Sequence, residues 1–189
     1  MAAAITMSPV GKEIKVASDK TIVGSGTSGH IVGGGFFLGE GVHNVIIRNL
    51  TIRDAYQGIW NDKDHDYDAV QMDGAHHVWI DHNDLRNMAD GLIDVRKDST
   101  NVTVSWNELS NNNKTFGIGW TENLVTDITV HHNWFRETEQ RNPPRTTAPT
   151  RTSTTTSSRT SRTPASTRRT ATTRGAPRGW SWRTATSRA

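Results

Sequence analysis

Four charged residues recur along the sequence at a nearly constant interval. Asp66, Asp90, Lys114 and Arg141 are separated by 24, 24 and 27 residues. If this interval is close to the length of one turn of a coiled chain, the four side chains lie on one face of the molecule. The spacing therefore predicts an acidic site with a lysine and an arginine in line with it.

Two further aspartates belong to the same predicted site. Asp68 is two residues after Asp66, and alternate side chains of a strand point to the same side. Asp94 is four residues after Asp90 and points the same way if the strand is unbroken. Because neighbouring strands lie about 4.8 Å apart, four carboxylates converge, and such crowding is costly unless a cation relieves it.

Calcium is the cation that these side chains suit best. It takes six to eight hard oxygen ligands in a flexible geometry, and the chain of 189 residues contains no cysteine that could supply a soft ligand. A solvated acidic face without a metal is the alternative. The lysine and the arginine in line with the acids make that alternative less attractive.

Short repeated strands must position these residues. Four segments superimpose without gaps, and an apolar residue follows each of them at the same distance: Asn44–Ile47 with Ile52, His77–Ile80 with Leu85, Asn101–Val104 with Leu109, and Asp127–Val130 with Phe135. The intervals between Val45, Val78, Val102 and Ile128 are 33, 24 and 26 residues, and Ile22 lies 23 residues before Val45. The chain therefore repeats one short-stranded unit.

The repeat predicts an all-β fold, a right-handed, single-stranded parallel β-helix. Apolar and polar residues alternate over three to five positions between Gly, Asn or Asp, whereas no segment has helical periodicity. A leucine-rich repeat would need a regular Leu pattern, and a propeller blade about 40–45 residues. Asn83, Asn107 and Asn133 share one register position, which predicts a structural asparagine ladder at a bend.

The sequence Gly24-Ser25-Gly26-Thr27-Ser28-Gly29 matches the glycine pattern of dinucleotide-binding loops. A helix should begin there in such a site, but residues 30–38 are interrupted by glycine and typical of strands. We therefore expect these glycines to form tight turns between coils.

The charge is divided unevenly along the chain. Residues 1–142 carry all 19 acids and 12 Lys or Arg, whereas residues 143–189 carry ten Arg and no acid. That tail has no Leu, Ile, Val, Met or Phe, and 22 of its 47 residues are Ser or Thr. We expect a partial β-helix domain at 1–142 and a disordered tail at 143–189, because the tail cannot bury enough apolar surface to offset the entropy of ordering.

The tail also has the features of a frameshifted continuation of the domain. Read one base out of register, the codons of Trp180-Ser181-Trp182 encode Val flanked by Met, Val or Leu, which is a strand pattern. An Arg-rich linker or nucleic-acid arm is the alternative, and nucleic acid is the less favoured partner. No stretch of about 18 apolar residues predicts a membrane span, and no secretory signal is visible at Met1–Met7.

The ordered set of motifs resembles polysaccharide lyase family 1, the pectate lyases. The resemblance covers most of residues 5–143, and the motifs that carry it are Asp66–Val70, Val78–Asn83, Asp90–Asp94, Val130–Asn133 and Gln140–Pro143. It implies a secreted, monomeric parallel β-helix enzyme that binds polygalacturonate with calcium and cleaves it by β-elimination.

The resemblance also implies roles for the residues of the predicted site. Asp66, Asp68, Asp90 and Asp94 would be the calcium-site carboxylates, Lys114 would bind the substrate carboxylate, and Arg141 would abstract the proton. A guanidinium is ordinarily charged, so an electrostatic role beside a water or hydroxide base stays open. We expect that the coils that follow Arg141 in the family, and part of the first coil before Ile5, are missing here, which would weaken or abolish activity. The family's further arginine would fall near Arg145, inside the tail.

Two other functions stay open. One is a non-catalytic β-solenoid that binds acidic polysaccharide through calcium. The other is a nucleic-acid binder that acts through the Arg-rich tail.

Overall fold

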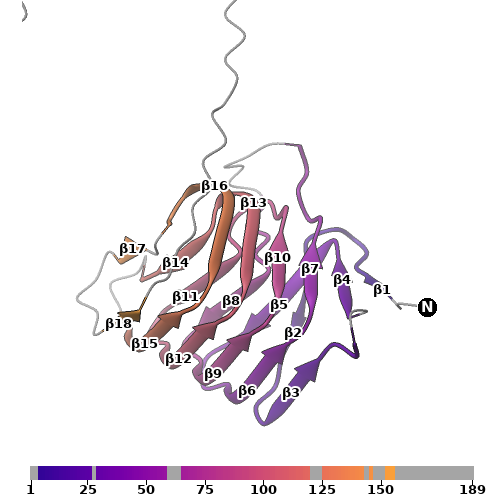
Figure 1. Ribbon diagram of the computed structural model, residues 1–189. Coiled ribbons are helices and arrows are strands. Elements are labelled where there is room, and N and C mark those ends of the chain that lie inside the picture. Colours follow the sequence, from indigo (N-terminus) through magenta and orange to yellow (C-terminus); the bar gives the residue numbers. More distant parts are fainter. Residues whose placement is uncertain are drawn as a thin grey trace, which may run out of the picture.

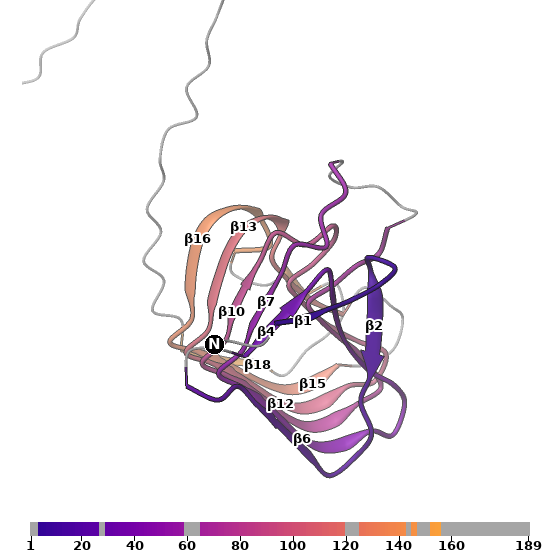
Figure 2. The same ribbon diagram turned by 90° about the vertical axis from the view of Figure 1, so that its right-hand side faces the viewer.

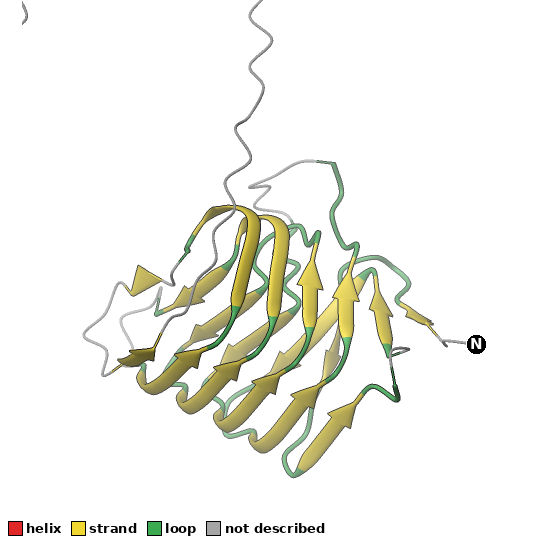
Figure 3. Cartoon of the chain, in the orientation of Figure 1, coloured by secondary structure: helices red, strands yellow, loops and turns green. Residues whose placement is uncertain are grey.

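A computed structural model describes residues 4–26, 29–58, 65–119, 125–142, 145–146 and 152–155. All regular structure in these residues is β-strand (Figure 3). The strands form three parallel sheets, and each turn of the chain contributes one strand to each sheet (Figure 1). In the view turned by 90°, the three sheets surround a common interior (Figure 2). The predicted parallel β-helix is therefore confirmed.

The three sheets are named here A, B and C in the order in which the chain visits them. Sheet A contains β1 (Ala4–Thr6), β4 (His30–Val32), β7 (Thr51–Arg53), β10 (Asp84–Arg86), β13 (Glu108–Lys114) and β16 (Trp134–Gln140). Sheet B contains β2 (Lys12–Lys15), β5 (Gly34–Leu38), β8 (Val70–Asp73), β11 (Ile93–Arg96), β14 (Phe116–Ile118) and β17 (Arg145–Thr146). Sheet C contains β3 (Lys20–Val23), β6 (His43–Arg48), β9 (His76–Asp81), β12 (Thr100–Ser105), β15 (Thr126–His131) and β18 (Thr152–Thr155).

The predicted repeat positions form two columns of buried side chains. In sheet C, Val45 pairs with Val78, Val78 with Val102, and Val102 with Ile128. In sheet A the same holds for the column Ile52, Leu85, Leu109 and Phe135. All of these side chains are buried, and burial of such a side chain contributes about 1.5–3 kcal/mol.

One register differs from the sequence prediction. The repeat placed Ile22 opposite Val45, whereas the structure pairs Ile22 with Ile47 and Lys20 with Val45. The shift is two residues, and side chains of a strand alternate with a period of two, so the inward and outward faces are unchanged. The segment 24–29 connects β3 to β4, as expected, and its residues 27–28 lie outside the described part.

The corner between sheets C and A depends on one backbone conformation. The residue at each corner has a positive φ of 52–56°: Asn49, His82, Trp106 and His132. Side chains other than glycine rarely adopt this left-handed conformation, so the sharp corner needs compensating contacts.

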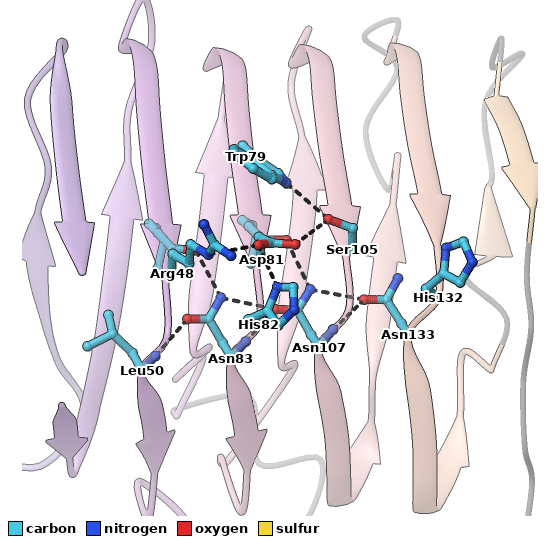
Figure 4. Close-up of polar contacts among 12 residues, drawn as sticks. Arg48, Leu50, Trp79, Asp81, His82, Asn83, Ser105, Asn107, His132 and Asn133 are labelled. Carbon is cyan, nitrogen blue, oxygen red and sulfur yellow. Dashed lines mark hydrogen bonds and ion pairs between the residues drawn. The ribbon is translucent and has the colours of Figure 1, made fainter. Parts of the chain in front are cut away.

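The asparagine ladder supplies those contacts, as the sequence predicted (Figure 4). The backbone N–H and Nδ2 of Asn83 donate to Asn107 Oδ1 at 2.9 and 3.0 Å. The same two groups of Asn107 donate to Asn133 Oδ1 at 3.0 and 2.9 Å. At one end of the ladder, the N–H of Leu50 donates to Asn83 Oδ1 at 3.0 Å. All three amides are buried, so each holds two turns together.

Two short strands lie within the segment 143–189. β17 pairs with β14, and β18 pairs with β15, so sheets B and C continue past residue 142. The rest of that segment lies outside the described residues, and the expected domain boundary stays a prediction. In the described part, no helix is long and apolar enough to cross a membrane.

The ladder predicts a large stability loss on changing its central member. Asn107→Ala should lower the free energy of unfolding by about 2–4 kcal/mol, because buried N–H groups of Asn83 and a carbonyl of Ile80 lose their partner. Urea unfolding measures the loss. Thr103→Ala, on the outer face of sheet C, is the control; an equal loss in both variants would contradict the role of the ladder.

Candidate functional site

The predicted site residues lie where the chain passes from sheet A to sheet B. Asp66 and Asp68 precede β8, Asp90 lies between β10 and β11, and Asp94 is the second residue of β11. β7 pairs with β10, and β8 pairs with β11. The segments before β8 and before β11, which carry these aspartates, therefore lie in neighbouring turns. They leave the upper ends of β7 and β10 in Figure 1.

The two basic residues come from the following turns. Lys114 is the last residue of β13, and Arg141 directly follows β16. β13 and β16 are the longest strands of sheet A and curve toward the same edge (Figure 2). The structure therefore brings the six predicted residues to one side of the solenoid.

Three of the aspartates form a compact group. One carboxylate oxygen from each of Asp66, Asp68 and Asp90 lies within 4.8 Å of the others. Asp68 is buried, and its Oδ1 accepts a hydrogen bond from the N–H of Gly91. Its Oδ2 is also buried and has no hydrogen-bond partner among the described residues. An orphaned carboxylate oxygen is costly, so this atom points to a missing ligand.

Cations face the other three acids. Lys114 pairs with Asp90. Arg141 Nη1 lies 3.2 Å from Asp94 Oδ1, and Arg96 Nη1 lies 3.6 Å from Asp66 Oδ2. Asp94 is therefore held beside the group of three by Arg141. These pairs reduce the repulsion, but they leave Asp68 without a cation of its own.

The acid cluster is electrostatically strained. Burial, followed by the charges of Asp94, Asp90 and Asp66, raises the pKa of Asp68 well above its ordinary value. Burial raises the pKa of Asp94 from 3.8 to about 6, although Arg141 opposes this shift. The pKa of Asp66 is raised as well, first by burial. Each carboxylate would thus be stabilised in its charged form by additional positive charge.

Gly91 leaves the space into which two of these carboxylates fit. A Cβ at this position would lie 2.7 Å from Asp68 Oδ1 and 2.9 Å from Asp94 Oδ1. Both distances are shorter than a van der Waals contact allows. A side chain at this position would therefore require the two carboxylates to shift.

The residues present fit a hard divalent cation. The group of three offers only carboxylate oxygens, one of them buried and unpartnered, at separations that ligands of one calcium ion can span. The chemistry of this donor set excludes a preference for soft metals. Asp94 adds a fourth carboxylate next to Asp68 across Gly91.

Sequence reasoning missed two charged residues at this site. Arg96 contacts Asp66 and also donates to Asp73 through Nε at 2.9 Å. The sequence could have predicted Arg96, because it lies two residues after Asp94 and alternate side chains of a strand point to the same side. Burial, and then the charge of Asp66, raises the pKa of Glu13 of β2, so this carboxyl interacts electrostatically with the cluster. No repeat position pointed to Glu13.

The histidines and tryptophans at the corners do not join the site. His82 Nδ1 lies 2.6 Å from Asp81 Oδ2, and the ring of Trp106 stacks between His82 and His132. Trp79 Nε1 donates to Ser105 Oγ at 3.0 Å (Figure 4). Packing and hydrogen bonding account for these residues. Trp60 and Trp120 lie outside the described residues.

The fold and the site together define a parallel β-helix protein with a group of acidic side chains at one sheet edge that could hold a metal ion. The comparison with family models agrees: the pectate lyase model matches residues 3–148. The chain belongs to the pectate lyase family.

Relatives and solved structures give the same result. The chain is 37% identical over 140 residues to a pectate trisaccharide-lyase of Thermotoga maritima, a match that covers 70% of this chain and 38% of the relative. It is 36% identical over 149 residues to probable pectate lyase 5 of Arabidopsis thaliana, covering 71% and 36%. The structure of a pectate lyase from Bacillus sp. N165 in complex with trigalacturonate matches with a TM-score of 0.57 and 32% identity, covering 70% of this chain and 41% of that one. The chain thus spans well under half the length of these proteins.

The raised pKa values predict how stability depends on pH without metal. A carboxyl group whose pKa is higher in the folded than in the unfolded chain binds protons more tightly when folded, so stability falls as pH rises through about 4 to 6. For Asp94 the pKa change corresponds to about 3 kcal/mol. Urea unfolding in a chelator at pH 4.5 and 7 should show this fall, and Asp94→Asn should reduce it. A variant with an unchanged pH dependence would contradict the assignment.

Proposed function

We propose that this chain carries the reaction centre of a calcium-dependent pectate lyase that cleaves polygalacturonate by β-elimination. The observation that carries the proposal is the convergence of aspartates from neighbouring turns with Lys114 and Arg141. The proposal includes action outside the cell as a monomer, which follows from the family resemblance.

Asp66, Asp68 and Asp90 would hold the calcium ion, with Asp94 as the fourth carboxylate. The Oδ2 of Asp68 supports this assignment most directly, because it is buried and has no hydrogen-bond partner in the part of the chain that the structure describes. The chemistry that calcium supplies when bound is neutralisation of the negative charge shared by these acids and the substrate carboxylate. Lys114 would then turn from Asp90 toward the substrate.

The substrate explains why this charge arrangement is useful. Each galacturonate unit carries a carboxylate next to C5, and removal of the C5 proton builds negative charge on that carboxylate. Lys114 stabilises this charge, and Arg141 takes the proton in our proposal. The electron pair of the C5–H bond forms the C4–C5 double bond while the C4–O4 bond breaks. O4 leaves with the bonding electron pair and takes a proton from water. The products are a shortened chain and a 4,5-unsaturated sugar.

Arg141 must lose a proton before it can accept one. Arg141 Nη1 lies 3.2 Å from Asp94 Oδ1, so this pairing has to weaken in the reactive state. If Asp94 also binds a metal ion, its pairing with Arg141 becomes weaker. The geometry places Arg141 beside the acid cluster and only partly exposed, at 12% of its side-chain surface.

The direct test is product formation. Polygalacturonate with calcium should give a product that absorbs in the ultraviolet through its new double bond, and a chelator should abolish the signal. Calcium binding without product would instead support a non-catalytic, polysaccharide-binding solenoid. If calcium does not bind at all, the proposal fails.

Two variants separate metal binding from proton transfer. Asp94→Asn should weaken calcium binding about tenfold or more in calorimetry, because a buried carboxylate is lost from the cluster. Arg141→Ala should leave calcium affinity nearly unchanged and remove turnover, with a loss on the order of 10²–10⁴-fold for a general base.

The pH profile of Arg141→Ala identifies the base. A rate that rises tenfold per pH unit in both the original chain and Arg141→Ala would mean that hydroxide acts as the base and that Arg141 only stabilises charge, whereas such a rise in the variant alone is expected when Arg141 is the base. Equal losses of affinity and turnover in both variants would contradict the assigned roles.

Gly91→Ala tests the geometry of the cluster. Its methyl group would force Asp68 and Asp94 apart, so calcium affinity should fall about tenfold in calorimetry. Gly39→Ala is a matched control, because its Cβ would meet only the flexible ring of Phe37 at 3.2 Å. Unchanged affinity in Gly91→Ala would show that the two acids do not act together.

A further inference from the structure

Asn112 is a buried amide that contacts the backbone of two site residues. It lies in β13 and is 2% exposed. Its Nδ2 donates to the carbonyl oxygen of Asp90 at 2.8 Å and to that of Lys114 at 2.7 Å. Its Oδ1 accepts the N–H of Met88 at 2.7 Å. One side chain therefore connects the Asp90 loop with the end of the strand that carries Lys114.

The Asp90 loop is held from both sides. The N–H of Asp90 donates to the carbonyl oxygen of Tyr67 at 3.3 Å, between Asp66 and Asp68 in the preceding turn. Its carbonyl oxygen is bound by Asn112 from the following turn. Loss of the Asn112 amide would free one side of the loop, and Asp90 could then move relative to the other two acids.

A bend in β13 brings Asn112 to this position. Asn111 has a φ of 46°, and Glu137 of the neighbouring strand β16 has a φ of 53°. Both strands bend there, and Asn112 remains paired with Thr138. The bend turns the last residues of β13 toward the loop, so that Asn112 reaches Met88 and Lys114 reaches Asp90.

Asn113, the next residue, hydrogen-bonds to a different strand. Its Nδ2 donates to Glu139 Oε2 at 3.0 Å, and its Oδ1 accepts from Gln140 Nε2 at 2.9 Å. Both partners belong to β16. Asn113 is also buried, at 7% exposure, and the hydrogen bonds of its amide within the described residues go to β16 rather than to the Asp90 loop. The chain thus has two adjacent buried asparagines, of which only Asn112 is shown to hydrogen-bond to the backbone of site residues.

We infer that Asn112 is a positioning residue that fixes Asp90 and Lys114 for calcium and substrate binding. The inference rests on the proposed function, because it assigns the purpose of the contact to that same site. Asn112 itself touches neither the metal nor the substrate. It acts through the backbone of the loop and of the strand end.

Calcium titration of the full chain by calorimetry tests the inference. Asn112→Ala should weaken calcium binding about tenfold or more, whereas Asn113→Ala and Asn107→Ala should change it less than about twofold. Asn107→Ala is the essential comparison, because it removes a buried amide of a structural ladder away from the site. Equal effects of Asn112→Ala and Asn107→Ala on calcium affinity would overturn the inference.

Hydrogen exchange provides a second measurement that needs no metal. In a chelator, the Met88 amide should be protected in the original chain and exchange at least about tenfold faster in Asn112→Ala, while the amides of β12 keep their protection. Unchanged exchange at Met88 would overturn the inference. A chain that binds no calcium would refute the proposed function, and the exchange result would still decide whether Asn112 orders the loop.

Discussion

The parallel register between successive turns is the constraint on which the rest of this structure depends. Each strand pairs with the strand that follows one turn later, and the same sequence positions therefore stack in columns. In sheets A and C the columns are Val, Ile, Leu and Phe, and they form the core. At the edge between sheets A and B the same stacking brings together residues with like charge. The interactions that stabilise the core thus also create the acidic site.

Such a site is unfavourable by itself, and the structure shows how the cost is reduced. Lys114, Arg141 and Arg96 each pair with one aspartate, and the Gly91 N–H binds Asp68. One buried carboxylate oxygen still has no partner among the described residues. A scaffold with many backbone hydrogen bonds between turns can tolerate this local strain. The strain in turn favours binding of a divalent cation, which links the fold to the proposed chemistry.

The features that repeat along the chain could be predicted from the sequence. The alternation around Val45, Val78 and Val102 gave the sheet positions, and the shared register of Asn83 and Asn107 predicted the ladder. The spacing of Asp66 and Asp90 predicted their approach for the same reason. Each of these inferences needs only a period and the rule that alternate residues share a face.

The features that depend on loop conformation could not be predicted. Glu13 interacts electrostatically with Asp66 from another turn and has no repeat partner. Asn112 contacts Met88 where β13 bends at Asn111. The pairing of Arg141 with Asp94, rather than with Asp66 or Asp90, likewise depends on side-chain reach. The register of β3, a short strand at one end of the solenoid, also differs by two residues from the register that the repeat predicted.

Diffraction from crystals soaked in calcium, or in a lanthanide that replaces it, locates the ion directly. The account predicts density within about 2.3–2.6 Å of carboxylate oxygens from at least two neighbouring turns, Asp68 among them, with Lys114 moved away from Asp90. Density bound elsewhere on the solenoid, or an unchanged Lys114–Asp90 pair at a saturating calcium concentration, would contradict it.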